Sequence, residues 1–196
     1  MDRNSNRKSP WRTRPVAPGK RLAALRGIGG AQLVEFALVL PLLLLLFTGL
    51  LDFATAYNLK HKLNNAAREG ARLATSQSRA DLTQPTPPGP PSVQVVRDEV
   101  VSYLTNAGVD TSFIGSTMTA AGGGAWTYYS SGTYGLKIER AFPIPATGGG
   151  NIQGTRVTLN YPYNWSFGFN RIITFAVPSA SYPATVSIST DAVMQD

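Results

Sequence analysis

The sequence predicts an α+β protein, in which a long N-terminal membrane-spanning helix precedes a small β-rich domain with one packed helix. Three observations support this fold class. Residues 31–51 form one apolar run with three polar exceptions. The helical pattern continues past this run to about Thr75. From Thr117 onward, alternation of apolar and polar residues indicates β-strands.

Residues 1–30 form a basic leader. They hold eight basic residues and one acid, whereas the remaining 166 residues carry ten basic and ten acidic side chains. A basic segment can bind phosphate, but before an apolar run it more often marks the cytoplasmic flank of a membrane helix. We therefore predict a disordered leader and no nucleic-acid partner. Five basic residues in 11–30 against three in 52–71 predict a cytoplasmic N-terminus and an extracytoplasmic C-terminal domain.

Residues 31–78 are predicted to form one helix that includes a membrane segment and a stalk. The apolar run at 31–51 would span about 31 Å, which is the thickness of a bilayer core. Pro41 lies inside this run, where a membrane helix tolerates it better than a soluble helix does. After Asp52 the pattern becomes amphipathic, with apolar residues at helical spacing.

A proline-rich linker is predicted at 79–91, because "QPTPPGPP" holds five prolines in eight residues. An extracytoplasmic α+β domain should follow at 92–196. Its helix would begin at an N-cap, Ser92, and end near Gly108, with four to five mostly antiparallel strands packed on it. The helix has an apolar stripe of Val93, Val96, Val100 and Leu104. The expected strands include a hairpin turning at Ser131–Gly132 and the segments "TRVTLNYPYNW", "RIITFAVP" and "ATVSISTDAVMQD".

The stretch "RGIGGAQLVEFALVLP" places a carboxylate, Glu35, inside the apolar run, where a charge is costly. The small residues Gly27, Gly29 and Gly30 offer an extended backbone that a protease can grip. A cut after Gly30 would give Ala31 a new α-amino charge. Glu35 would lie about one helical turn away, close enough to offset that charge in its own or a neighbouring helix. The position of Glu35 is therefore explained if cleavage after Gly30 creates its charge partner, the α-amino group of Ala31.

This arrangement resembles the class III signal of type IV pilin-like proteins, in which prepilin peptidase cuts after glycine and the fifth mature residue is glutamate. Glu35 followed by Phe36, with "NNAAREGARLAT" after the apolar run, resembles the TadE-like family of minor pseudopilins. These proteins belong to tight-adherence (Flp) pilus systems. The resemblance is dense over residues 27–75. Beyond it, "RVTLNYPYNW" and "STDAVMQD" only loosely resemble the C-terminal strands of that family.

The resemblance implies a structural, non-enzymatic pseudopilin of the cytoplasmic membrane or the pilus, with a pilin-like N-terminal helix. Prepilin peptidase would cut between Gly30 and Ala31, and Glu35 and Phe36 would serve helix assembly. The implied partners are prepilin peptidase, other pilins and pseudopilins, the inner-membrane pilus assembly platform and membrane lipid. A second stretch would pack against partner helices; its residues are Ala67, Arg68, Glu69, Gly70 and Arg72.

Four alternatives stay open. The chain could be an uncleaved single-pass envelope protein that displays a ligand-binding β domain. Glu35 could simply snorkel toward headgroups. A Sec signal peptide could be cut after Ala54-Thr55-Ala56, although the apolar run is longer than the usual 7–15 residues. The "AAREGAR" stretch could also be an ordinary solvated surface.

No catalytic constellation is visible in the sequence. The single histidine, His61, lies between two lysines, and the chain contains no cysteine, so the usual zinc ligand sets are missing. The glycine-rich stretches "AGGGAW" and "TGGGN" lack the lysine of a phosphate-binding loop. We therefore expect no enzyme activity, no metal site and no cofactor.

Overall fold

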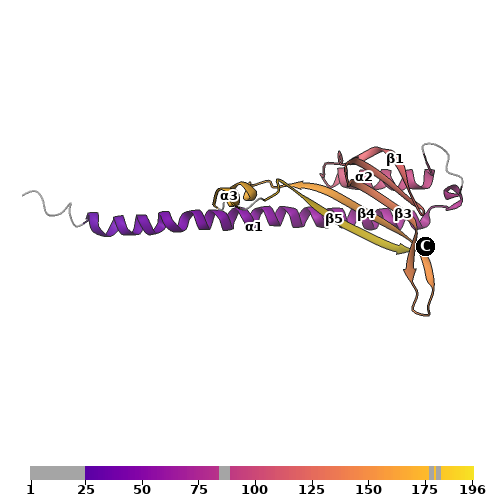
Figure 1. Cartoon of the computed structure of the whole chain (residues 1–196), viewed down its shortest axis with the longest axis horizontal. Helices are drawn as coiled ribbons and strands as arrows, with labels where there is room; N and C mark the ends of the chain where they lie inside the picture. Colours follow the sequence, from indigo (N-terminus) through magenta and orange to yellow (C-terminus); the bar gives the residue numbers. More distant parts are fainter. Residues whose placement is uncertain (1–24, 84–88, 177–178, 180–181) are drawn as a thin grey trace, which may run out of the picture. The chain divides into compact units, whose positions relative to one another are not determined.

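A computed structural model describes residues 25–83, 89–176, 179 and 182–196 of the chain. It confirms the α+β fold class (Figure 1). The chain divides into two compact units, Met1–Leu44 and Leu45–Asp196. The elements are α1 (Leu25–Ser76), the 3-10 helix η1 (Ala80–Leu82), α2 (Pro91–Asn106), β1 (Ile114–Gly122), β2 (Ala125–Ser131), β3 (Tyr134–Pro145), β4 (Asn151–Asn164), α3 (Phe169–Ala176) and β5 (Thr185–Gln195).

The helix α1 begins six residues before the predicted start at Ala31. The glycine-rich end of the leader is therefore helical, and residues 1–24 of the leader lie outside the described residues. No proline lies between Leu25 and Ala31, and each residue added to an existing helix gains one hydrogen bond. The helix accommodates Pro41 in its interior and ends at Ser76, close to the predicted end.

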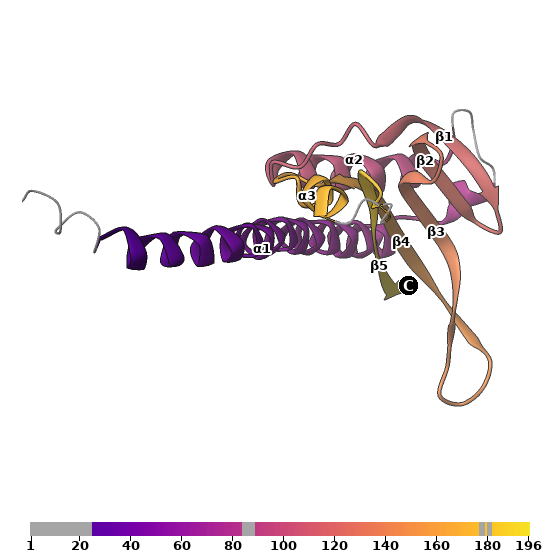
Figure 2. The same cartoon turned by 60° about the vertical axis from the view of Figure 1, so that its left-hand side comes forward.

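The five strands form one antiparallel sheet in the order β1-β2-β3-β4-β5, as expected for consecutive hairpins. The turn between β2 and β3 lies at Gly132–Thr133, within one residue of the predicted position. The β3–β4 hairpin extends beyond the other strands and ends in the glycine-rich loop at 146–150 (Figure 2). The strands β1 and β5 form the two edges of the sheet.

The core of the second unit lies between one face of the sheet and two helices. The predicted stripe of α2 is fully buried, and so is a face of α1 that includes Leu63, Ala67 and Ala71. On the sheet, Leu136 pairs with Leu159 and both side chains are buried. The stalk part of α1 is therefore a component of the same core as the strands. The core side chains are Leu63, Ala66, Ala67, Ala71, Ala74, Val93, Val96, Val100, Leu104, Val109, Phe113, Ile114, Trp126, Tyr128, Leu136, Ile138, Val157, Leu159 and Ala192.

The helices α1 and α2 approach closely at Gly70. A Cβ atom at this position would lie 2.5 Å from Cγ2 of Val100, which is closer than packed carbon atoms come. The approach brings the buried valines of α2 against the small residues of α1. A glycine in a helix interior costs about 1 kcal/mol relative to alanine, so the close packing explains its presence here.

The start of α2 differs from the prediction that Ser92 is its N-cap. The helix begins at Pro91, and Ser92 lies inside its first turn. Asp81, in η1, provides the cap instead: Oδ2 accepts a hydrogen bond from the Ser92 backbone N–H at 2.7 Å, and Oδ1 accepts one from its hydroxyl at 3.0 Å. Part of the predicted linker is thus ordered against α2, while residues 84–88 of it lie outside the described residues.

The segment "RIITFAVP" was predicted to be a strand, and this prediction is wrong. Residues 169–176 form the helix α3, and the last two residues of the segment lie outside the described residues. The β-branched residues Ile172, Ile173 and Thr174 favour a strand by propensity. Tertiary contacts at the start of α3, described below, override that preference.

Candidate functional site

The N-terminal part of α1 carries a continuous apolar surface. Twelve of its large apolar side chains are between 38% and 76% exposed, whereas Leu45 is half-buried. Within the described residues, α1 is the helix that is long and apolar enough to cross a membrane. Exposed apolar side chains of this extent indicate a membrane-anchored, single-pass protein. These side chains are Leu33, Val34, Phe36, Leu38, Val39, Leu40, Leu42, Leu43, Leu44, Leu46, Phe47 and Leu50.

The predicted cleavage and assembly residues lie on this surface. Gly30, Ala31, Glu35 and Phe36 are all exposed. A Cβ atom added at Gly30 would meet nothing within 4 Å among the described residues. The Glu35 carboxylate has no hydrogen-bond or ion-pair partner in the described part of the chain. The structure thus leaves these residues free for contacts with other molecules, and cleavage after Gly30 stays a prediction.

The "AAREGAR" stretch divides into a buried and an exposed side. Ala67 and Gly70 are buried in the core of this chain, so that they face its own α2 and sheet. Arg68 and Arg72 are exposed, and Arg72 forms an ion pair with Glu69 at 2.7 Å. The hydrogen bond from Arg72 lowers the pKa of Glu69. Of the five residues predicted to contact partner helices, Arg68, Glu69 and Arg72 lie outside the core, and their contact with partner helices stays a prediction.

A buried acid, Asp52, was not singled out by the sequence. It is the first charged residue after the apolar run, and it is fully buried. Its Oδ1 accepts a hydrogen bond from the backbone N–H of Phe167 at 2.8 Å, and its Oδ2 accepts one from the N–H of Phe169 at 3.0 Å. The carboxylate thus binds one backbone N–H just before α3 and one at its first residue, where the helix dipole favours negative charge. The backbone oxygen of Asp52 accepts a further hydrogen bond, from the hydroxyl of Tyr163, at 3.1 Å.

Aromatic rings surround the contact between Asp52 and the start of α3, which we call the Asp52 anchor. Trp165 lies 5.8 Å from Phe53, 5.9 Å from Tyr163 and 5.6 Å from Phe169, measured between ring centroids. The first two pairs are edge-to-face, which is a favourable geometry for aromatic rings. The anchor and the rings together join α1, the end of β4 and α3. The signal that could have found this cluster is an acid placed directly after an apolar run.

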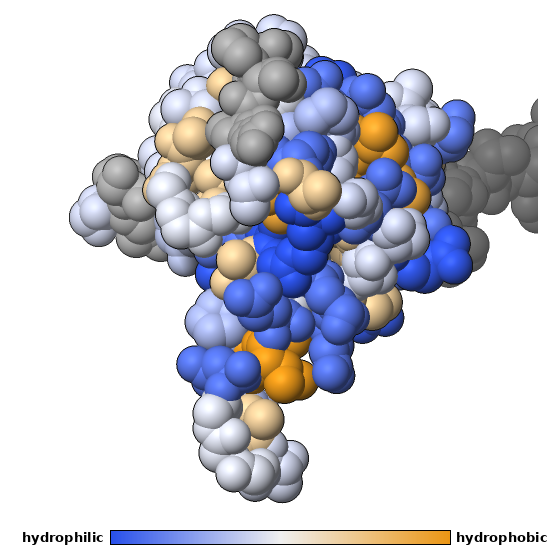
Figure 3. All heavy atoms as spheres, turned by 90° about the vertical axis from the view of Figure 1, so that its right-hand side faces the viewer, coloured by the Kyte–Doolittle hydropathy of each residue, from blue (hydrophilic) through white to orange (hydrophobic). Residues whose placement is uncertain are grey.

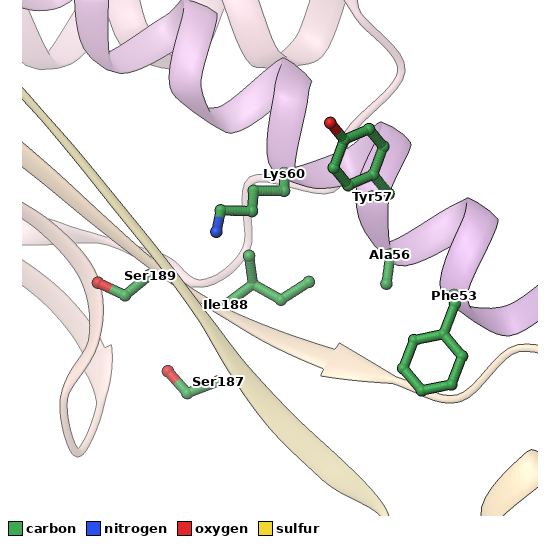
Figure 4. A pocket seen from close by; sticks show the side chains of 7 residues that line it. All are labelled: Phe53, Ala56, Tyr57, Lys60, Ser187, Ile188 and Ser189. Atoms are coloured by element: carbon green, nitrogen blue, oxygen red, sulfur yellow. The ribbon is translucent and has the colours of Figure 1, made fainter.

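An open hollow of about 400 Å³ lies between α1 and the edge strand β5. Figure 4 shows Ile188 of β5 projecting toward α1, while the hydroxyls of Ser187 and Ser189 point to the other side of the strand. Phe53 and Tyr57 of α1 line the hollow and are more than half exposed. The combination of an open edge strand with exposed rings is typical of a protein-contact surface rather than an enclosed ligand site.

A second hollow of about 300 Å³ lies between α2 and the strands β1 and β2. Tyr128 lines it and is buried, and its hydroxyl has no hydrogen-bond partner among the described residues. The guanidinium of Arg97 lies 5.8 Å from the centre of the Tyr128 ring. Burial raises the pKa of Tyr128 to about 12.

The substitution Tyr128→Phe is expected to leave stability at pH 7 unchanged or to raise it by up to about 1 kcal/mol, because it removes a buried hydroxyl without a partner. In the unfolded chain a tyrosine loses its proton near pH 10, whereas Tyr128 in the fold loses it near pH 12. The parent protein should therefore lose stability as the pH rises from about 10 to about 12, and Tyr128→Phe should lose less. Thermal unfolding of both proteins across this range would measure the difference. Identical pH profiles would contradict the burial of this hydroxyl.

The single histidine does not lie in a metal-binding group. His61 packs against Tyr57 on α1, with a distance of 4.4 Å between ring centroids. Among the described residues, no three of the histidine and acidic side chains are grouped so that they could hold a metal ion.

No curated protein and no solved structure shows significant similarity to the chain. A protein-family model matches residues 30–72 of the chain. This range begins at Gly30, contains Glu35 and Asp52, and ends at Arg72 of the "AAREGAR" stretch. The match supports the association of this protein with a tight-adherence pilus. The membrane segment and stalk of this chain are thus similar to the family described as TadE-like protein, as their sequence motifs predict.

Proposed function

We propose that this chain is a structural, non-enzymatic minor pseudopilin of a tight-adherence pilus. In this proposal a prepilin peptidase cuts the precursor after Gly30, and the N-terminal helix then packs with the helices of other pilins during pilus assembly. The observation that carries the proposal is the exposed apolar surface of α1, which bears an unpaired carboxylate inside the segment that matches the TadE-like family.

The helical start of α1 bears on the cleavage step. The segment around Gly30 is helical, whereas a protease grips an extended chain. Three glycines, Gly27, Gly29 and Gly30, lie in this first part of the helix. Each lowers the cost of unwinding by about 1 kcal/mol relative to alanine. The glycines would therefore allow the first turns to open for the peptidase.

Glu35 would act after cleavage. A charge near the hydrocarbon region costs about 3 kcal/mol when it has no partner. The new amine of Ala31 and the carboxylate of Glu35 would offset each other, within one helix or between neighbouring helices. An attraction between helices would also favour one axial register, because only one offset brings the two charges together.

The substitution Gly30→Asp is expected to block maturation, because a bulky charged residue replaces the small residue at the cleavage site. The protein should then accumulate in the membrane at the precursor length when it is produced together with a prepilin peptidase. An immunoblot would show the difference of 30 residues. Gly27→Asp serves as the control, because it places the same side chain three residues before the residue at the scissile bond. Normal processing of Gly30→Asp would contradict the proposed site.

The substitutions Glu35→Gln and Glu35→Leu are expected to allow insertion and most of the cleavage, but to abolish co-purification with pilin partners. Loss of about 3 kcal/mol corresponds to a more than hundredfold weaker association. The control is Gln32→Leu, which changes an exposed polar residue about one turn earlier on the same helix. If either Glu35 variant assembles as well as the parent, the carboxylate merely snorkels and the proposal loses its main physical support.

A further inference from the structure

The helix α3 exposes large apolar side chains on the surface of the second unit. Phe175 is 89% exposed, which is far more than a phenylalanine on a soluble surface usually is. Phe167, just before the helix, and Tyr182, after it, are each about half exposed, at 48% and 47%. Arg171 of the same helix is also exposed. Exposed aromatic residues beside a basic residue are typical of helices that lie in a membrane interface.

The contacts of α3 fix its level along α1. A Cβ atom at Gly49 would lie 2.9 Å from the ring of Phe169, so the ring packs directly on the α1 backbone there. One turn further along α1, Asp52 holds the start of α3 through two hydrogen bonds. The apolar run of the sequence ends at Leu51. The helix α3 is therefore held at the level where a membrane-spanning α1 would leave the hydrocarbon.

The same level of α1 also has an apolar surface. Within the second unit, Leu46, Phe47 and Leu50 are each more than half exposed. The ring of Phe169, at the start of α3, packs on the α1 backbone at Gly49, which lies between Phe47 and Leu50 in the chain. Figure 1 shows α3 at the end of the domain where α1 enters it. The face at the opposite end mixes hydrophilic and near-neutral residues with small hydrophobic patches (Figure 3).

Trp165 has the environment of a residue at a membrane surface. Its ring packs among Phe53, Tyr163 and Phe169, while its indole N–H donates a hydrogen bond to the backbone oxygen of Pro183 at 3.1 Å. Tryptophan and tyrosine are enriched where a protein passes from hydrocarbon to water, because one end of each ring is apolar and the other is polar.

We propose that α3 lies in the membrane–water interface, with Phe167 and Phe175 inserted among the lipid chains. The occupant of this surface is lipid, because Gly49 and Asp52 hold α3 at the level where the apolar run of α1 ends. The second unit would then be held against the bilayer in two ways. The helix α1 connects it covalently to the membrane segment, and α3, which Asp52 holds in place, contacts the lipid. This inference rests on membrane anchoring by α1, which the proposed function shares, and not on cleavage or pilus assembly.

The proposal can be tested with spin labels on the full chain in vesicles of phosphatidylethanolamine and phosphatidylglycerol. The chain contains no cysteine, so a single cysteine places each label without further changes. The test position is Phe175→Cys. Leu46→Cys on α1 serves as the lipid reference, and Val95→Cys, an exposed apolar position on α2, serves as the water reference. Power saturation measures the accessibility of each label to oxygen, which concentrates in lipid, and to a water-soluble nickel complex.

We expect the oxygen-to-nickel ratio at position 175 to resemble that at position 46 and to be several-fold above that at position 95. A ratio at 175 equal to that at 95 would overturn the proposal. Low accessibility to both reagents at 175 would also overturn it, because protein rather than lipid would then cover the surface. High nickel accessibility at position 46 would show that α1 itself is outside the bilayer, and both inferences would fail. Defects in cleavage or pilin binding leave the measurement unchanged, because the vesicles contain only this protein.

Discussion

A fragment that begins at Ser92 is expected not to fold, whereas a fragment of residues 52–196 is expected to fold. The sheet and α2 share their core with the stalk part of α1, whose contributing side chains are fully buried. Removing Leu63 and four alanines alone forfeits on the order of 5 kcal/mol of apolar burial. It also exposes the valines of α2 to water. A domain is typically stable by about 5–15 kcal/mol, so this loss removes most or all of its stability.

Circular dichroism and thermal unfolding of the two fragments would measure this difference. The longer fragment should give a cooperative transition and a near-ultraviolet spectrum of ordered aromatic rings. The shorter fragment should give neither. A cooperative transition in the fragment that begins at Ser92 would show that residues 92–196 form an independent domain, and that the contacts of α1 add little to it.

The substitution Asp52→Ala is expected to lower the free energy of unfolding by about 2–3 kcal/mol. Two backbone N–H groups at the start of α3 lose their acceptor, and unsatisfied buried donors are costly. Asp52→Asn retains one acceptor oxygen and should cost about half as much. The effect should be concentrated at α3, because the hydrogen bond from Tyr163 goes to the Asp52 backbone and survives both substitutions.

Urea unfolding of the full chain in detergent would measure these values. The near-ultraviolet signal of the aromatic residues, to which Trp165 contributes, would report on the ring cluster beside Asp52. Asp98→Ala is the matched control, because Asp98 is an exposed acid on α2. If Asp52→Ala is no more destabilising than Asp98→Ala, the carboxylate does not hold α3. The inference that α3 is held at the membrane interface would then lose its main support.

The sequence predicted the elements whose pattern is local. The stripe of α2 from Val93 to Leu104, the hairpin after Ser131 and the strand at the C-terminus follow from periodicity and turn residues, and the structure confirms them. The segment of α1 around Glu35 was found through its chemistry, because a carboxylate in an apolar run needs an explanation.

The missed features depend on contacts between distant residues. The start of α3 is held by Asp52, more than a hundred residues earlier, and no local pattern reveals that contact. The apolar residues Phe169, Ile172 and Ile173 do have helical spacing, which was the available signal against their strand propensity. The packing of Gly70 inside the chain was missed for a related reason. Small residues on a helix indicate a close approach, but they do not show which surface approaches.

The N-terminus of the mature protein tests the central claim most directly. The full chain would be produced in cells that contain a prepilin peptidase, purified from the membrane, and analysed by mass spectrometry of its N-terminal peptide. The account predicts a mature chain that begins at Ala31, which makes Glu35 the fifth residue. A chain that retains Met1 would contradict processing and favour an uncleaved envelope protein. A chain that begins at Tyr57 would instead show that the apolar run is a Sec signal peptide.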